Sequence, residues 1–225
     1  MRSETGSDLT ANPLKGIAAV VFDVGETLVN EERPWSEWAD WIGVSRAVFF
    51  AALGATVAMR QDHRRVFEIL APGFNFTQEH QAKDAAGHEW RIVAEDLYPD
   101  AVPCLQQLRS SGYRVGIAAN QPVQAEQALN ELGLPVDFVA TSGGWGVAKP
   151  SGEFFRRLAE KTGVPAAKIA YVGDRLDNDV LPAANAGMRS VFIRRGPWGL
   201  IHATWPEVSV ADMRIDSLGE LAEWL

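Results

Sequence analysis

Three acidic residues and one lysine have the types and positions expected of a site that binds a metal ion and an anionic group. Asp23, Lys149, Asp174 and Asp179 each follow a predicted buried strand, directly or after a short loop. In parallel sheets, ligands bind outside the carboxyl ends of the strands. Carboxylates that converge there repel one another unless a cation joins them. Oxygen ligands without a thiolate or clustered histidines favour Mg²⁺ over zinc.

A simpler interpretation exists for each acid alone. Asp174 and Asp179 precede a predicted helix, where side-chain oxygens cap free N–H groups and face the helix dipole. Capping does not account for the whole set, because Asp23 and Lys149 follow other strands at the same predicted edge. The ordered set therefore favours a functional site.

The elements that must position these residues alternate along most of the chain. Apolar, β-branched runs predict strands at residues 17–22, 113–119, 136–140, 168–172 and 190–193. Start and stop signals predict helices at residues 103–110, 122–132, 151–163, from 178 or 179 to 187, and 218–225. This alternation predicts an α/β fold with a doubly wound, parallel, Rossmann-like sheet.

Residues 31–97 interrupt that alternation and contain no clear strand signal. Helical stretches are predicted there at residues 35–41, 45–59, 62–70 and 77–97. Trp35, Trp38 and Trp41 share one helix face, which indicates packing within this block or, alternatively, an aromatic substrate entrance.

Three sequence segments resemble motifs of the haloacid dehalogenase superfamily. VVFDVGETLV around Asp23, AKP around Lys149 and VGDRLDNDVLPAANAGM around Asp174 are similar to its first, third and fourth motifs. The resemblance implies a catalytic core of residues 16–30 and 98–225. Residues 31–97 would form a small helical cap, and residues 1–15 would form a flexible leader.

The resemblance also implies roles for the site residues. Asp23 would attack the substrate phosphorus and form an aspartyl-phosphate, while Lys149 would hold Asp23 and the phosphoryl oxygens. Asn120 would help to shape the phosphate pocket, together with Gly25. The implied Mg²⁺ ligands are Asp23, the Gly25 backbone carbonyl, Asp174 and Asp179, the last directly or through water.

Two positions depart from the phosphatase pattern. Gly25 stands where the family usually has an acidic general acid/base, and Ala119 stands where it usually has Ser or Thr. These departures predict a slow phosphatase, a substrate with a good leaving group, or a different acid. Glu26 and Glu31 are the nearest candidates for that acid, although a solvated loop position is the simpler expectation for both.

Four functions are compatible with these residues. The complete acidic cluster favours a phosphatase of a small phosphorylated metabolite. A metal-independent 2-haloacid dehalogenase would use the Asp23 nucleophile but has less need of Asp174 and Asp179. A phosphonatase would need a Schiff-base lysine, for which Lys83 is the only candidate between residues 31 and 97. A weakly active or non-catalytic protein that binds a phosphorylated ligand is the fourth possibility.

Composition limits the partners. The 225 residues carry a formal net charge of −8, which disfavours binding to nucleic acid or to an anionic membrane surface by charge. Cys104 is the only cysteine, and no apolar signal segment or long apolar run is present, so we expect a cytoplasmic protein. The sequence carries no signal for the oligomeric state.

Overall fold

The core of the protein is a six-stranded, entirely parallel sheet. The computed structural model describes residues 12–89 and 91–225, so most of the leader predicted at residues 1–15 lies outside the described residues. In spatial order the strands are β3 (Phe138–Thr141), β2 (Arg114–Ala119), β1 (Ala19–Phe22), β4 (Ile169–Gly173), β5 (Arg189–Ile193) and β6 (Met213–Ile215). The predicted α/β class with a doubly wound sheet is confirmed.

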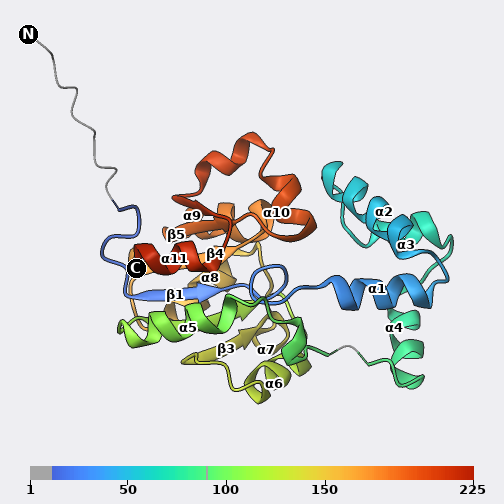
Figure 1. Ribbon diagram of the computed structural model, residues 1–225, viewed down its shortest axis with the longest axis horizontal. Coiled ribbons are helices and arrows are strands. Elements are labelled where there is room, and N and C mark those ends of the chain that lie inside the picture. Colours follow the sequence, from blue (N-terminus) through green and yellow to red (C-terminus); the bar gives the residue numbers. More distant parts are fainter. Residues whose placement is uncertain (1–11, 90) are drawn as a thin grey trace, which may run out of the picture.

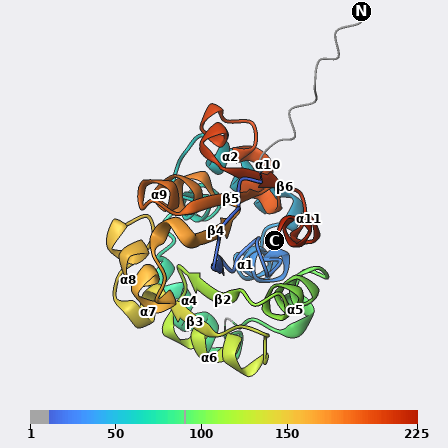
Figure 2. The ribbon, with the colours of Figure 1, turned by 90° about the vertical axis from the view of Figure 1, so that its left-hand side faces the viewer.

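Helices cover both faces of the sheet, as Figure 2 shows. Side chains alternate along β1, so Val20 and Phe22 face one hydrophobic cluster while Val21 faces another. The first cluster is covered by α5 (Ala101–Ser110), α6 (Val123–Glu131) and α11 (Leu218–Trp224). The second is covered by α8 (Gly152–Thr162) and α9 (Leu181–Asn185). Burial on both faces explains the continuous apolar runs of the strands.

A group of four helices extends from one end of the sheet (Figure 1). We call it the helical group; its members are α1 (Glu32–Trp41), α2 (Arg46–Ala58), α3 (Arg65–Leu70) and α4 (Phe76–Ala85). These helices share a hydrophobic cluster of their own, built around Trp38, Phe49 and Phe67. Trp198, from α10 (Gly196–His202) of the sheet-bearing part, joins that cluster and connects the two parts.

The two connectors to the helical group lie side by side. The Asn30 backbone N–H donates to the Asp96 carbonyl over 2.8 Å, and Val29 forms an isolated bridge with Leu97. The chain therefore leaves and re-enters the sheet-bearing part at one place.

Three sequence predictions of elements were wrong. The helix predicted over 77–97 ends at Ala85, because Gly87 adopts a left-handed φ of 81° that a right-handed helix cannot continue. Strand β6 was missed because it has only three residues, and its middle residue, Arg214, is exposed. Helix α10 was missed because Gly196 and Pro197 at its start are typical of a loop.

No single helix among the described residues is long and apolar enough to cross a membrane, although α1 and α2, bent by 112°, together have a sufficient length and composition.

Candidate active site

The strands β1 and β4 bring Asp23 and Asp174 to one edge of the sheet. Phe22 pairs with Val172, so the residues that follow both strands leave the sheet at the same level. The Asp23 backbone N–H donates to the Val172 carbonyl over 2.9 Å, which fixes the start of the loop. The chain builds outward to β2 and β3 on one side and to β4, β5 and β6 on the other, so this is the switch point at which ligands bind.

Lys149 is buried between two of the three acids. Its Nζ lies 2.7 Å from Asp23 Oδ1 and 2.6 Å from Asp179 Oδ1. Burial alone would lower the pKa of Lys149, but the Asp179 and Asp23 carboxylates outweigh burial and hold that pKa well above its ordinary value. Lys149 is therefore a fixed positive charge beside both carboxylates.

Asn120 holds the backbone of Lys149. Its Oδ1 accepts from the Lys149 N–H over 2.8 Å, and its Nδ2 donates to the Lys149 carbonyl over 2.9 Å. The side chain thus positions Lys149, and its expected phosphate contact stays a prediction. Ala119, just before it, is buried in the hydrophobic core and offers no hydroxyl.

Asp23, Asp174 and Asp179 form a buried acidic cluster in which one oxygen of each carboxylate lies within 4.8 Å of the others. Asp174 Oδ2 is buried without a hydrogen-bond partner among the described residues. Burial, and then the Asp179 and Asp23 charges, raise the pKa of Asp174 well above its usual range. Burial likewise raises the pKa of Asp179 to about 6, against the opposing effect of Lys149. A divalent cation would relieve this repulsion, and the donor set fits Mg²⁺.

A π-helical turn, Leu176–Val180, returns Asp179 to the end of β4. Asp179 Oδ2 accepts from the Arg175 backbone N–H over 3.0 Å. A Cβ at Gly173 would lie 2.4 Å from Asp179 Cγ, so only glycine allows this carboxylate to lie against the strand. Arg175 pairs with the exposed Asp177 and not with the acidic cluster.

The loop after β1 differs from the expectation at both of its glutamates. Glu26 is buried, and its carboxylate accepts from the Tyr98 hydroxyl and the Glu31 backbone N–H. Glu31 is partly buried, and its carboxyl group lies directly beside Gly25. Burial, and then the Glu26 and Asp23 charges, raise the pKa of Glu31 to about 8. The expectation of two solvated loop residues was wrong, because the loop folds back against the entrance of α1.

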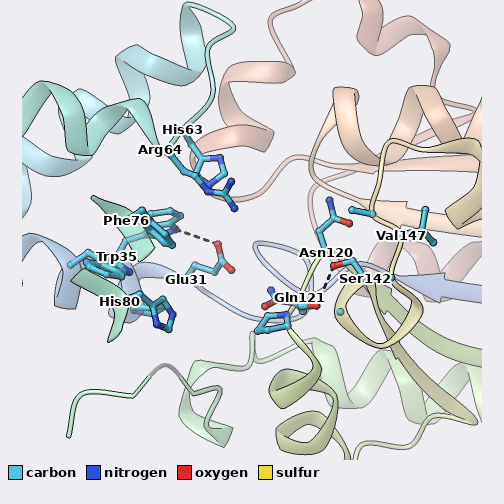
Figure 3. Close-up of a pocket in the computed structure, with 16 residues that line it drawn as sticks. Glu31, Trp35, His63, Arg64, Phe76, His80, Asn120, Gln121, Ser142 and Val147 are labelled. Carbon is cyan, nitrogen blue, oxygen red and sulfur yellow. Dashed lines mark hydrogen bonds between the residues drawn. The ribbon is translucent and has the colours of Figure 1, made fainter. Parts of the chain in front are cut away.

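Three adjoining cavities open at this edge, and one of them, of about 520 Å³, is lined by Lys149, Arg175 and Asn178 among others. The Asp23 cavity, of about 240 Å³, is lined by Asp23, Lys149 and Asp174 among others. The aromatic cavity, of about 660 Å³, lies between the helical group and the loops that follow β2 and β3 (Figure 3). Six residues line both the Asp23 cavity and the aromatic cavity: Glu31, Trp35, His63, Arg64, Asn120 and Gln121.

The aromatic stripe of α1 packs as expected, and its alternative role as a substrate entrance stays a prediction. Trp35 and Trp38 pack in the helical group and also line the aromatic cavity, whereas Trp41 donates to Glu79. Arg64, whose guanidinium lies over the Phe76 ring, reaches both the Asp23 cavity and the aromatic cavity. Sequence reasoning missed His63 and Trp198, since neither belongs to a recognisable motif and helix α10 was not predicted.

Comparisons with known proteins agree with this arrangement. The haloacid dehalogenase-like hydrolase family matches residues 17–187. A glyceraldehyde 3-phosphate phosphatase from Methanopyrus kandleri is 31% identical over 227 aligned residues, covering 92% of this chain and 96% of that one. A phosphoserine phosphatase from Thermus thermophilus is 34% identical over 56% of this chain and 49% of its own.

Solved structures share the fold. The HAD-hydrolase YfnB from Bacillus subtilis, bound to magnesium, has a TM-score of 0.66 at 19% identity, covering 93% of this chain and 98% of that one. A dehalogenase has a TM-score of 0.64 at 22% identity, covering 94% and 98%. The family match and the full-length relative show that this chain is an enzyme of the haloacid dehalogenase-like hydrolase family.

Proposed function

We propose that the protein is a Mg²⁺-dependent phosphatase of a small phosphorylated metabolite, acting through an aspartyl-phosphate on Asp23. One observation carries the proposal: Lys149 holds Asp23 within a buried acidic cluster, and an Asp174 oxygen of that cluster has no hydrogen-bond partner among residues 12–89 and 91–225. Lys149 holds the Asp23 carboxylate in place over 2.7 Å, and a nucleophile must be positioned in this way. The phosphatase names of the relatives support the same reaction class.

The metal would be held by Asp23, Asp174 and Asp179, with the Gly25 carbonyl as a further oxygen ligand. When bound, Mg²⁺ would stabilise the negative charge of the transferring phosphoryl group. Lys149, which Asp23 and Asp179 hold in place, would supply a second positive charge to the same phosphoryl oxygens. Asn120 would keep that lysine in position through its two backbone contacts.

We further propose that residues 16–30 and 98–225 act as the catalytic core and residues 31–97 as a cap. The aromatic cavity lies between these parts and adjoins the Asp23 cavity. A phosphoryl group in the Asp23 cavity would therefore leave the rest of the substrate in the aromatic cavity. Its volume of about 660 Å³ suits a small metabolite. Location in the cytoplasm stays a prediction.

The alternative functions lack comparable support. A metal-independent dehalogenase has no need of an acidic cluster that is costly without a cation. A phosphonatase would need Lys83 at the reacting centre, but Lys83 Nζ donates to Glu37 and to the His88 carbonyl. A non-catalytic ligand-binding role does not require the buried ion pair between Lys149 and Asp23.

The test is a panel of small phosphate esters and 2-haloacids, assayed with Mg²⁺ and with EDTA. We expect phosphate release from at least one ester that requires Mg²⁺, and a covalent phosphate adduct that maps to Asp23. Halide release in EDTA would favour the dehalogenase. Wild-type turnover by Asp23→Asn would exclude every mechanism in which Asp23 forms a covalent intermediate.

A further inference from the structure

The carboxyl group of Glu31 fills the space that a side chain at position 25 would occupy. A Cβ built on Gly25 would lie 2.6 Å from Glu31 Oε1 and 2.7 Å from Glu31 Cδ, and its three nearest heavy atoms all belong to that carboxyl group. Gly25 does not have a positive φ, so its backbone would accept an ordinary L residue. The glycine is therefore needed to make room for Glu31 and not for backbone conformation.

Two hydrogen bonds hold Glu31 in this position. Trp35 Nε1 donates to Glu31 Oε2 over 3.2 Å, and the Glu31 backbone N–H donates to Glu26 Oε1 over 3.1 Å. Glu26 is fixed in turn by the Tyr98 hydroxyl and by close packing against Gly196, which has a φ of 63°. Because Trp35 binds Oε2, Oε1 is the oxygen that lies against Gly25.

The location of Glu31 suits a group that gives a proton to the leaving oxygen. Glu31 lines both the Asp23 cavity and the aromatic cavity, so it would lie near the bond between a phosphoryl group in the first and the rest of the substrate in the second. Figure 3 shows Glu31 among the residues that line the aromatic cavity. Two other groups near this boundary are less suitable. Both oxygens of Glu26 already accept hydrogen bonds, and the His63 ring is packed edge-on against Trp35 and Trp198.

We propose that Glu31 is the proton donor and acceptor of this site, an inference that rests on the proposed phosphatase function. In the first step an Asp23 oxygen bonds to phosphorus, the bond from phosphorus to the leaving oxygen breaks, and the Glu31 carboxyl proton passes to that oxygen. In the second step water bonds to phosphorus and gives a proton to the Glu31 carboxylate. The bond from phosphorus to Asp23 then breaks, which releases phosphate and restores both side chains.

The first test separates the two steps with 4-nitrophenyl phosphate and Mg²⁺. Its leaving group departs without a proton, so Glu31→Gln should still release about one equivalent of 4-nitrophenolate per enzyme in a rapid burst. The following steady-state rate should fall by about 10²–10⁴-fold, because water has lost its base. Glu32→Gln, at the exposed neighbouring residue, is the matched control and should behave as wild type.

The second test places a carboxyl group at position 25 in place of the one at position 31. Gly25→Asp alone should lose activity because its side chain collides with Glu31, whereas Gly25→Asp with Glu31→Ala should recover at least tenfold over Glu31→Ala. Steady-state rates of Glu31→Gln within about threefold of wild type, absence of the burst, or no recovery in the double variant would each overturn the role of Glu31. A failure of the phosphatase proposal itself is distinguishable from these outcomes, because the wild-type protein would then form no phosphorylated Asp23.

Discussion

The two sides of the Asp23 carboxylate are built in different ways. On one side, Lys149, Asp174 and Asp179 come from strand ends and the turns that follow them, and burial holds them in fixed contact. On the other side, Gly25 leaves an opening that Glu31 fills from the entrance of the helical group. The side that we propose to bind metal, the metal-binding side, is thus part of the sheet. The side that we propose to transfer protons, the proton-transfer side, depends on how the helical group joins the sheet.

This difference has a physical basis. Parallel strands place their carboxyl ends at one edge, so the strand direction alone brings together the groups that follow those strands. Glu31 meets Gly25 only because the Val29 and Asn30 backbone pairs with Leu97 and Asp96. Substitutions on the two sides should therefore change the activity and the stability of the protein in different ways.

The largest effect should come from the nucleophile shared by both sides. Asp23→Asn should lower kcat by about 10⁶-fold, the scale on which removal of a nucleophile acts in an unrelated hydrolase. The isosteric amide keeps the fold, so the melting temperature in Mg²⁺-free buffer should stay the same or rise. Phosphate release under single-turnover conditions measures the loss, and residual activity within tenfold of wild type would contradict it.

The metal-binding side can be broken separately at Asp174. Asp174→Asn should abolish the stabilisation of the fold by Mg²⁺, because the ion loses a ligand and part of its countercharge. In EDTA the same variant should melt above wild type, because one of three buried carboxylates that repel one another has been neutralised. Relief of about 1 kcal/mol would shift the melting temperature by about 2–4 °C in a chain of this size.

Thermal melts with and without Mg²⁺ provide this measurement. Asp177→Asn is the matched control, because its side chain is exposed and pairs with Arg175 only. An unchanged Mg²⁺ response in Asp174→Asn would place the ion elsewhere.

A smaller effect is expected at Asn120, which positions Lys149. Asn120→Ala leaves the buried Lys149 backbone N–H and carbonyl without their partner, a loss of about 1–3 kcal/mol. If the displaced lysine acts mainly in catalysis, kcat should fall about 10–100-fold. Steady-state kinetics test this, with Asn130→Ala on the exposed surface of α6 as the control.

The smallest effect is expected in the pH dependence of stability, which Glu31 should influence separately from its effect on the rate. The folded-state pKa of Glu31, about 8, lies above the ordinary value of 4.5, so the folded protein binds the extra proton between these values. Stability from this group is present below about pH 4.5 and is lost as pH rises through 8. Without metal, wild type should lose on the order of 1 kcal/mol more between pH 5 and pH 8 than Glu31→Gln does.

Denaturant unfolding in EDTA at both pH values measures this difference. Equal losses in the two proteins would mean that Glu31 titrates normally and that the loop is open to solvent. In that case only the metal-binding side would keep the role proposed for it.

Sequence reasoning reached most of the core because its signals are local. Ser151 and Gly163 bound α8 as expected, with the Ser151 hydroxyl accepting from Glu153 and Gly163 in a left-handed conformation. The apolar runs identified the five longer strands, and the residues after them identified the acidic cluster. Where no local signal existed, as for β6 and α10, the prediction failed.

The sequence alone thus determined the sheet, its edge and the types of group that meet there. The hydrophobic periodicity and the alternation of strands and helices along the chain are both set by nearby residues. Only the tertiary structure decided that Glu31 replaces a side chain at Gly25 and that Asn120 clamps Lys149. Gly25 and Glu31 lie six positions apart in one loop, whereas Asn120 and Lys149 lie 29 positions apart on separate loops; sequence spacing encodes neither contact. Packing against neighbouring elements sets such contacts, and it also decides whether a carboxyl group is solvated or buried.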